Sequence, residues 1–332
     1  MKYKYSVIIP IDLDLRPFDI LKKVKSILKR SSDEVEIVFG HNDRGSIFDK
    51  YLKRITKKNN VKLVSGKFYT RLICQSLLRN RAVEQCSSEF IYLMDVDCLF
   101  DEELSDGCIN DIKSDKNPLI ILFCLYLSKK GSREVFKHTR EEMFDKYIAF
   151  RKDLYLHLAS PSASIFMKKT DYFAVGGFDE EFMGHGGEDF EFMIKLALYK
   201  NVIKPTKDLM LNKFYKAPLL SEGFRKYLAF NGLPYFFDKK IVFHLHHRRN
   251  KLFGYFKQYH KNSNLLQEKI KLDSSLEENE ESLIEFYEQL CKKYDVSIDK
   301  YSVLFDSYKP KKFTLDHILL FFKKTVDVKT FK

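Results

Sequence analysis

The stretch Phe90-Ile91-Tyr92-Leu93-Met94-Asp95-Val96-Asp97 decides the fold prediction, because a short apolar run leads directly into two carboxylates. Such a run is typical of a buried strand in a parallel sheet. Asp95 and Asp97 are two positions apart, so in an extended chain their side chains point the same way. Carboxylate oxygens suit Mg²⁺ or Mn²⁺, and such an ion can neutralise a phosphate group. The stretch therefore predicts a metal site at the end of a strand, and an ordinary aspartate-rich turn is the alternative.

Strand-like and helix-like segments alternate before this stretch. Apolar runs predict strands at residues 6–10, 35–40 and 61–64. Helical periodicity predicts a helix at residues 20–29, and residues 47–57 and 71–85 also read as helices. The alternation predicts a doubly wound α/β fold, with a mostly parallel central sheet flanked by helices. Ligands on such sheets bind at the carboxyl ends of the strands, which is where Asp43, Asp95 and Asp97 fall.

The elements predicted after Asp97 are less regular. Apolar patterns predict strands at residues 119–123, 164–167 and 241–246, and a core-facing helix at residues 188–200. Residues 205–240 read as an irregular, aromatic-rich insert, and the chain beyond residue 262 as charged helix.

A second acidic motif, Gly186-Gly187-Glu188-Asp189, opens the predicted helix at residues 188–200. Two glycines permit a close backbone approach or a positive φ. The helix dipole favours ionised carboxylates at this end of a helix, and an ionised carboxylate can take a proton from an attacking hydroxyl. We interpret Asp189 as a general base and Glu188 as an acceptor-binding or supporting residue. An ordinary acidic helix start is the alternative.

A third motif, His244-Leu245-His246-His247-Arg248-Arg249, ends the last predicted strand. His244 and His246 alternate onto one face of that strand, and a neutral imidazole is a good ligand for Mn²⁺. We expect one of them to bind the metal, with His246 the first choice and His244 the second. Arg248 and Arg249 can hold a diphosphate or an anionic acceptor.

Composition sets the cellular context. The 332 residues include 30 Phe and are 45% hydrophobic, so the chain is a folded protein. The six cysteines lack metal-type spacing, and no apolar run is long enough to span a bilayer, so we expect a cytoplasmic protein unless something anchors it. The formal net charge of +12 is consistent with dispersed lysines on solvated helix faces, and the alternatives are nucleic acid, an anionic membrane surface or an anionic substrate as partner. No nucleic-acid motif is present, so nucleic acid is not expected.

The C-terminal segment over residues 315–324 offers one membrane hypothesis. Leu315, Ile318, Leu319 and Phe322 share a helix face with lysines close by, as in helices that lie on a membrane surface. Such a segment favours peripheral attachment to the inner face of the cell membrane. Packing of this helix on its own domain is the alternative.

Together these motifs resemble the inverting GT-A glycosyltransferases, especially the bacterial family 2 enzymes of capsule and lipopolysaccharide synthesis. The strand Ser6–Pro10, the helix segment Leu78–Ala82 and the strand into Asp97 carry this resemblance, while Gly176–Phe192 resembles β-1,4-galactosyltransferases and related N-acetylgalactosaminyltransferases. The resemblance covers roughly residues 3–250. It differs where His41-Asn42-Asp43-Arg44 replaces the usual Asp-Asp-Gly-Ser, and where the histidine motif lies far downstream of Asp189.

The resemblance implies a GT-A fold and the following assignments. Residues 1–260 form the catalytic domain, with a nucleotide-binding half in 1–100 and an acceptor-binding half in 101–260, and residues 261–332 form a helical C-terminal extension. The catalytic residues are Asp189 and Glu188. The residues that bind a UDP-sugar are Pro10, Asp43, Arg79, Asp95 and Gly187, and the ligands of Mn²⁺ (or Mg²⁺) are Asp97, Asp95, His246 and His244.

The implied function is metal-dependent transfer of a sugar from the UDP-sugar to a hydroxyl of a glycan or lipid-linked glycan, in bacterial capsule or surface polysaccharide synthesis. Attack in line on the anomeric carbon inverts its configuration. A nucleotidyltransferase is an alternative, although the chain has no Gly-rich, lysine-bearing phosphate loop near its first strand. A non-catalytic glycan-binding module is another alternative, and the intact carboxylates disfavour it.

Overall fold

The structure is a computed structural model that describes residues 3–59, 61–68, 72–213, 217–247, 254–270 and 282–306. Arg248, Arg249 and the expected membrane-surface segment at 315–324 lie outside the described residues. No helix in these ranges is long and apolar enough to cross a membrane. All six cysteines are buried, and none forms a disulfide.

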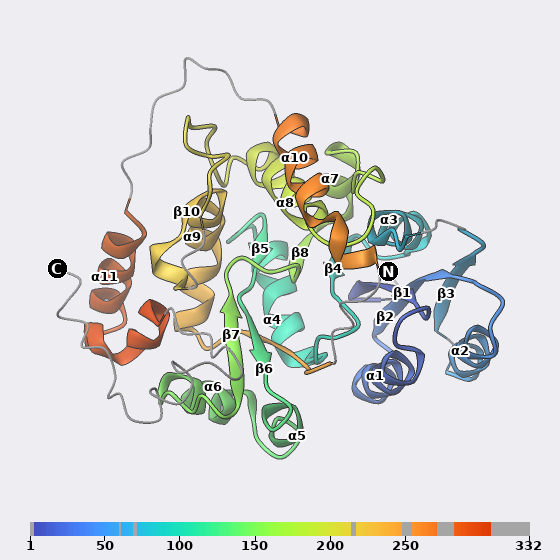
Figure 1. Ribbon diagram of the computed structural model, residues 1–332. Coiled ribbons are helices and arrows are strands. Elements are labelled where there is room, and N and C mark those ends of the chain that lie inside the picture. The colour runs from blue at the N-terminus through green and yellow to red at the C-terminus, as the bar shows by residue number, and fades with distance from the viewer. Residues whose placement is uncertain are drawn as a thin grey trace.

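The largest of the sheets has six strands and extends from β5 in the middle of the molecule to β3 at one side (Figure 1). Its order is β3-β2-β1-β4-β8-β5; the first four strands are parallel, and β8 runs antiparallel to both of its neighbours. The strands are β1 (Tyr5–Asp12), β2 (Val35–Asn42), β3 (Lys62–Gly66), β4 (Phe90–Leu93), β5 (Ile120–Ile121) and β8 (Ile165–Lys168). The predicted α/β class with a mostly parallel sheet is confirmed.

Helices cover both faces of this sheet because its strands are apolar on both sides. Val7 and Ile9 of β1 pack with α1 (Pro17–Arg30), α2 (Ile47–Lys58) and α4 (Glu102–Lys113), whereas Ile8 faces the opposite cluster, with α3 (Gln75–Gln85) and α8 (Glu188–Tyr199). The strand order reverses after β1, and right-handed crossovers therefore place α1 and α2 on one face and α3 on the other.

A second, three-stranded sheet brings the histidine motif to the carboxyl end of β4. It has the order β11-β6-β7 and consists of β11 (Val242–His244), β6 (Cys124–Leu127) and β7 (Tyr155–Ala159). The Leu99 N–H donates to the Phe243 carbonyl at 2.8 Å, and the Leu245 N–H donates to the Asp97 carbonyl at 2.8 Å. The chain that follows Asp97 is thus hydrogen-bonded to the chain around His244. The apolar run predicted as one strand at residues 119–123 instead divides between β5 and β6 of the two sheets.

The remaining elements surround these sheets. The short elements are α5 (Gly131–Glu134), α6 (Arg140–Ile148), α7 (Lys169–Ala174), β9 (Asn212–Lys213), β10 (Glu222–Gly223), and 3₁₀ turns at Pro218–Leu220, Gly254–Gln258 and Ile298–Phe305. In the described part of the chain after the histidine motif, α10 (Tyr259–Lys269) packs against α8, and α11 (Leu283–Lys293) packs against α9 (Phe224–Phe237). The expected domain division at residue 260 falls inside α10, and the division itself stays a prediction.

The prediction that residues 205–240 are irregular is wrong for the part that forms α9. This helix is buried on most of its surface, so its sequence has apolar residues on every side and no amphipathic period. It also contains Gly232 and Pro234, residues that ordinarily argue against a helix interior. Gly232 is needed because a Cβ there would lie 2.5 Å from the Phe123 ring.

Asn231 of α9 holds the end of the central sheet. Its side chain accepts from the Ile121 N–H at 2.7 Å and donates to the Leu119 carbonyl at 2.8 Å, and it is buried. Asn231→Ala removes the partner of two buried backbone groups. We expect a loss of roughly 2–4 kcal/mol in the free energy of unfolding, measured by urea titration. The exposed Asn110→Ala on α4 is the control; an equally small change in both variants would contradict this account.

Candidate active site

Arg79 on α3 joins the two acidic motifs. Its side chain is 2% exposed, and it donates to Oδ1 of Asp95 at 2.6 Å and to Oδ1 of Asp189 at 2.9 Å. Its guanidinium also lies over the ring of Phe178, 4.8 Å from the ring centre. The strand end at Asp95 and the helix start at Asp189 are therefore held by one buried cation.

Asn80, the next residue on α3, fixes the glycine loop that precedes α8. Its Oδ1 accepts from the Phe178 N–H at 3.0 Å and from the Tyr172 hydroxyl at 2.5 Å, and its Nδ2 donates to the Phe178 carbonyl at 2.9 Å and to Glu180 at 2.8 Å. Gly177 has φ +68°, and a Cβ there would lie 2.9 Å from Asn80 Oδ1. The loop therefore requires glycine at this position, and its place is set by the same helix that carries Arg79.

Glu188 and Asp189 begin α8 as predicted, but their surroundings differ. Gly187 has φ +99°, and a Cβ there would lie 2.7 Å from the Phe182 ring. The turn at Gly187 leads Glu188 into the interior, where it is 6% exposed and its Oε2 has no hydrogen-bond partner among the described residues. Asp189 is 28% exposed.

At Glu188 burial opposes the effect of the helix dipole that the sequence suggests. Burial, and then the charge of Asp189, raise the pKa of Glu188 from 4.5 to about 8. A helix terminus stabilises a charge by only about 0.3–1 kcal/mol at an exposed site, which is less than the loss of hydration on burial. Desolvation also raises the pKa of Asp95 to about 6, although Arg79 opposes the shift.

Asp97 has different partners from Asp95. Arg16 donates to both of its oxygens, at 3.0 and 2.8 Å, and Lys23 donates at 2.5 Å. Burial alone would raise the pKa of Asp97, but the hydrogen bonds and charge of Arg16, with the charge of Lys23, hold it well below its usual range. Arg16 and Lys23 both contact Asp19 as well, each at 2.9 Å.

The expectation that Asp95 and Asp97 point the same way is therefore not met. The Cys98 N–H donates to the Asp95 carbonyl at 2.9 Å, so residues 95–98 form a turn rather than extended chain. The strand ends at Leu93, before the two carboxylates, and the alternation rule no longer applies. One carboxylate meets Arg79 and the other meets Arg16 and Lys23.

Asp97, His244 and His247 form the group with metal-binding geometry. One ligand atom from each lies within 4.8 Å of the others, in a search restricted to the described residues. His244 is buried and stacks on Tyr126 with ring centres 4.0 Å apart, and His247 Nε2 lies 3.5 Å from Asp97. One carboxylate oxygen and two imidazole nitrogens are a donor set that suits Mn²⁺, so these residues fit the expected ion.

Two of the expected metal ligands lie outside this group. Asp95 is bound to Arg79, and His246 is exposed, with its backbone N–H donating to Ser132 at 2.6 Å. The face-sharing argument for His244 and His246 requires a strand through residue 246, whereas β11 ends at His244. His247 takes the place that was expected for His246. The histidine motif correctly indicated histidines near the metal group. Because the strand ends at His244, the second histidine is His247, one residue after the expected His246.

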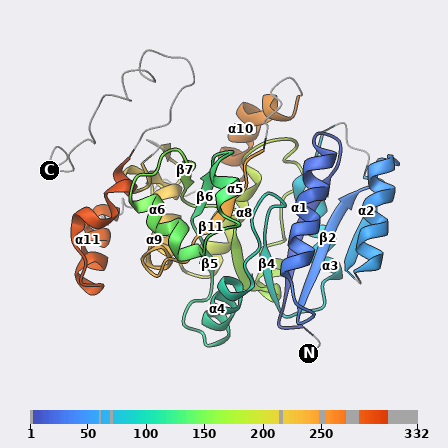
Figure 2. The same cartoon turned by 90° about the horizontal axis from the view of Figure 1, so that it is seen from below.

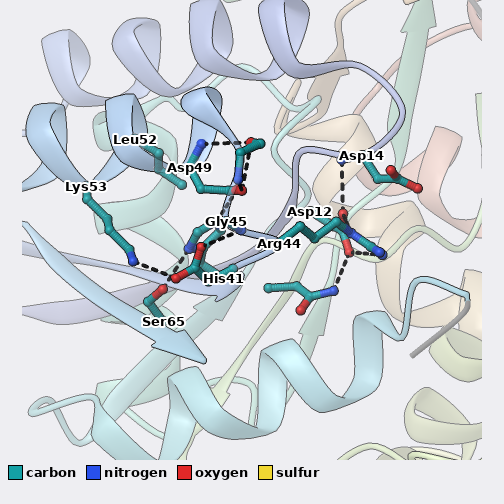
Figure 3. Close-up of polar contacts among 12 residues, drawn as sticks. Asp12, Asp14, His41, Arg44, Gly45, Asp49, Leu52, Lys53 and Ser65 are labelled. Atoms are coloured by element: carbon teal, nitrogen blue, oxygen red, sulfur yellow. Dashed lines mark hydrogen bonds and ion pairs between the residues drawn. The ribbon is translucent and has the colours of Figure 1, made fainter. Parts of the chain in front are cut away.

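A cluster of hydrogen-bonded polar side chains, which we call the polar hub, lies at the carboxyl ends of β1 and β2 (Figure 3). It includes Asp12, His41, Asn42, Asp43, Arg44, Asp49, Lys53 and Ser65. Asp43 is buried; it accepts from Lys53 at 2.6 Å and from the Gly45 N–H at 3.0 Å, and these contacts lower its pKa despite partial desolvation. Asp12 accepts two hydrogen bonds from Arg44, at 2.8 and 2.9 Å, and one from Asn42 at 2.8 Å.

His41 occupies the interior of this hub. It is fully buried, with Nε2 2.9 Å from Asp49 and Nδ1 2.9 Å from Ser65 (Figure 3). The segment His41-Asn42-Asp43-Arg44 thus ties β1, β2, β3 and α2 together. Asp12 was missed because the strand was expected to stop at Pro10. Instead β1 continues to Asp12, and beyond Ile8 it pairs only with β2.

Tyr255 lies close to the candidate site, and the sequence reasoning did not single it out. Its carbonyl accepts from the His185 N–H at 3.0 Å. Burial raises the pKa of its hydroxyl well above the usual range, and Glu188, Asp95 and Asp189 raise it further, which places Tyr255 near all three carboxyl groups. No motif distinguished this tyrosine from the other aromatic residues of the segment.

Comparison with known proteins identifies the family. Residues 6–272 match the family model described as glycosyltransferase like family 2. No curated protein sequence matches the chain.

Solved structures show distant similarities. A crystallised fragment of S. aureus TarS is 19% identical with a TM-score of 0.42, over 60% of this chain and 56% of that chain. The same fragment in complex with UDP-GlcNAc is 20% identical with the same TM-score, over 60% and 54%. The mannosyltransferase PcManGT from Pyrobaculum calidifontis, in complex with GDP-Man and Mn²⁺, is 17% identical with a TM-score of 0.38, over 60% and 53%.

The aligned part spans about half the length of each of these structures, and similarities this distant carry no argument about substrate. The family match covers most of the chain and includes both acidic motifs and the histidine motif. The chain belongs to the glycosyltransferase-like family 2.

Proposed function

We propose that this chain is a metal-dependent, inverting glycosyltransferase that moves a sugar from a UDP-sugar to a hydroxyl of a glycan or lipid-linked glycan. The observation that carries the proposal is the double contact of Arg79 with Asp95 and Asp189, which joins the strand end and the helix start in one site. Family membership supports sugar transfer, and the sequence resemblance supports uridine diphosphate. Pro10, Asp43, Arg79, Asp95 and Gly187 stay our candidates for the nucleotide-sugar site.

Asp189 is the proposed general base. Arg79 binds its Oδ1 and fixes its orientation, and the partly exposed carboxylate keeps a second oxygen for an acceptor hydroxyl. Glu188, whose raised pKa keeps it protonated near neutrality, can donate a hydrogen bond to the acceptor. A protonated neighbour also avoids adding a second negative charge beside the base.

Asp97, His244 and His247 are the proposed metal ligands. A divalent ion held there would neutralise the charge that develops on the departing diphosphate. Asp97 must exchange part of its contacts with Arg16 and Lys23 to bind it, and Asp19 is positioned to retain both cations when this happens. A role in capsule or surface polysaccharide synthesis at the inner face of the cell membrane is the biological setting that we propose.

The role of Asp189 predicts the behaviour of Asp189→Asn. The amide can still accept from Arg79 but cannot take a proton, so we expect transfer to fall about 100-fold or more while the affinity for the donor is kept. Donor binding by calorimetry and turnover of a panel of nucleotide sugars with Mn²⁺ measure the two effects. The exposed Asp115→Asn is the matched control. Turnover in Asp189→Asn equal to that of the control would remove Asp189 from the mechanism.

The metal proposal predicts opposite effects at two residues. Asp97→Ala should lose Mn²⁺ binding and activity, whereas Arg16→Gln should bind Mn²⁺ about tenfold more tightly, because a charged hydrogen-bonding competitor is gone. Electron paramagnetic resonance of free Mn²⁺ measures the affinity without reference to turnover. Arg151→Gln, at an exposed arginine, is the control. Activity that persists in a chelator would eliminate the metal requirement.

The raised pKa of Glu188 predicts a pH-dependent stability. The folded protein keeps this proton between pH 4.5 and about 8, where the unfolded chain has lost it, so the contribution of Glu188 to stability falls as pH rises through this window. The Glu188→Gln variant has no proton to lose at this position, so its stability should not fall in this window for that reason. We expect its Tm relative to the unaltered protein to increase by roughly 3–10 °C between pH 5 and pH 8. The exposed Glu89→Gln should show a constant difference, and a constant difference for Glu188→Gln would show that Glu188 is ionised.

A further inference from the structure

Helices α1 and α2 concentrate the positive charge of the chain. They contain ten Lys and Arg residues against two Asp residues, a net charge of +8 out of +12 for the whole chain. Ordinary solvated helices carry dispersed charges, whereas these two helices carry most of the net positive charge of the chain. This concentration indicates a negatively charged partner.

The two acidic residues of these helices do not neutralise the outward surface. Asp19 contacts Arg16 and Lys23 at 2.9 Å, and Asp49 is buried against His41 and the start of α2. The outward cations of α1 are Lys22, Lys25, Lys29 and Arg30. Those of α2 are Lys50, Lys53, Arg54 and Lys57. Within the described part of the chain only Lys53 of these eight forms an ion pair, with Asp43.

The two helices form one continuous surface. They lie side by side on the same face of the sheet in both views (Figures 1 and 2). Phe18 of α1 meets Phe48 of α2 edge to face at 4.8 Å, and Lys25 of α1 lies over the Tyr51 ring of α2 at 5.0 Å. We name the outward face of these two helices the α1–α2 surface.

Large apolar side chains stand on this surface among the cations. Phe18 is 77% exposed and Ile47 is 73% exposed, and each lies in the first turn of its helix. Phe18, Lys22, Lys25 and Lys29 recur at helical spacing, so they form one stripe along α1. Because α1 and α2 start at the carboxyl edge of the sheet, the apolar tips lie near the candidate active site, where Arg16 contacts Asp97.

We propose that the α1–α2 surface binds an anionic phospholipid bilayer. Helices that lie on membranes combine apolar side chains, which enter the headgroup boundary, with lysines and arginines that meet anionic lipids. Nucleic acid would use the same cations, but it gains nothing from an exposed isoleucine, whereas a bilayer does. Docking in this way brings the candidate active site to the lipid surface, where a lipid-linked acceptor is found. The binding itself does not depend on the proposed sugar transfer.

The chain contains no tryptophan, so Phe18→Trp provides a single fluorescent reporter on the α1–α2 surface. Mixed with vesicles of phosphatidylcholine and phosphatidylglycerol, the full-length variant should show indole emission at shorter wavelength, and vesicles of phosphatidylcholine alone should leave the emission unchanged. A second variant carries four more changes in this reporter background: Lys22→Gln, Lys25→Gln, Lys50→Gln and Arg54→Gln. Its affinity for the anionic vesicles, measured by the same emission shift, should fall on the order of 100-fold or more.

Four lysines elsewhere serve as the matched control in the same reporter background. Lys204, Lys292, Lys293 and Lys300 are also exposed, and their change to Gln removes the same charge. This control should keep the shift of the indole emission. Vesicle binding without a shift, an equal loss in the control, or tighter binding to a mixed-sequence DNA duplex than to anionic vesicles would each overturn the proposal. If the protein attaches to vesicles through another segment, the reporter indole stays in water and its emission does not shift. The emission therefore distinguishes that attachment from binding through the α1–α2 surface.

Discussion

The buried guanidinium of Arg79 is the interaction on which the candidate site depends. A cation without hydration is costly unless it is paired, and Arg79 is paired with Asp95 and Asp189, which lie far apart in the sequence. One positive charge cannot balance three carboxylates, and the raised pKa of Glu188 follows from this shortage as well as from burial. A lysine would not replace Arg79, because a single ammonium lacks the planar fork that reaches two carboxylates at once.

The two aspartates after β4 divide between two cationic clusters. The turn at residues 95–98 directs Asp95 to Arg79 on one face of the sheet. It directs Asp97 to Lys23 of α1, the helix on the other face, and to Arg16, which immediately precedes that helix. The carboxylate pair therefore does not act as a unit. Asp95 belongs with the acidic helix start, and Asp97 belongs with the histidines and with the segment between β1 and α1.

The sequence predicts the central fold well because its strands are short apolar runs bounded by polar turns, and the first two helices have a clear amphipathic pattern. It predicts α9 poorly because a helix buried on all sides has no period to detect. Strand and helix ends correctly indicate that Asp95 and Asp189 lie close together, with Arg79 between them. They do not indicate that Asp97 turns to Arg16 and Lys23 instead. The sequence also does not predict His247, the protonation of Glu188 or Tyr255, since these depend on where a strand ends and on which loops cover the site.

The backbone ladder between the chain after Asp97 and the chain around His244 has a consequence for sequence evolution. The Leu245 N–H and Leu99 N–H bonds set the separation between Asp97 and the histidines, whatever length of chain connects them. Insertions or deletions in the connecting region, such as the stretch between α8 and α9, can thus accumulate without shifting the ligand geometry. Two chains with different spacing between these motifs can therefore keep the same arrangement of Asp97 and His244.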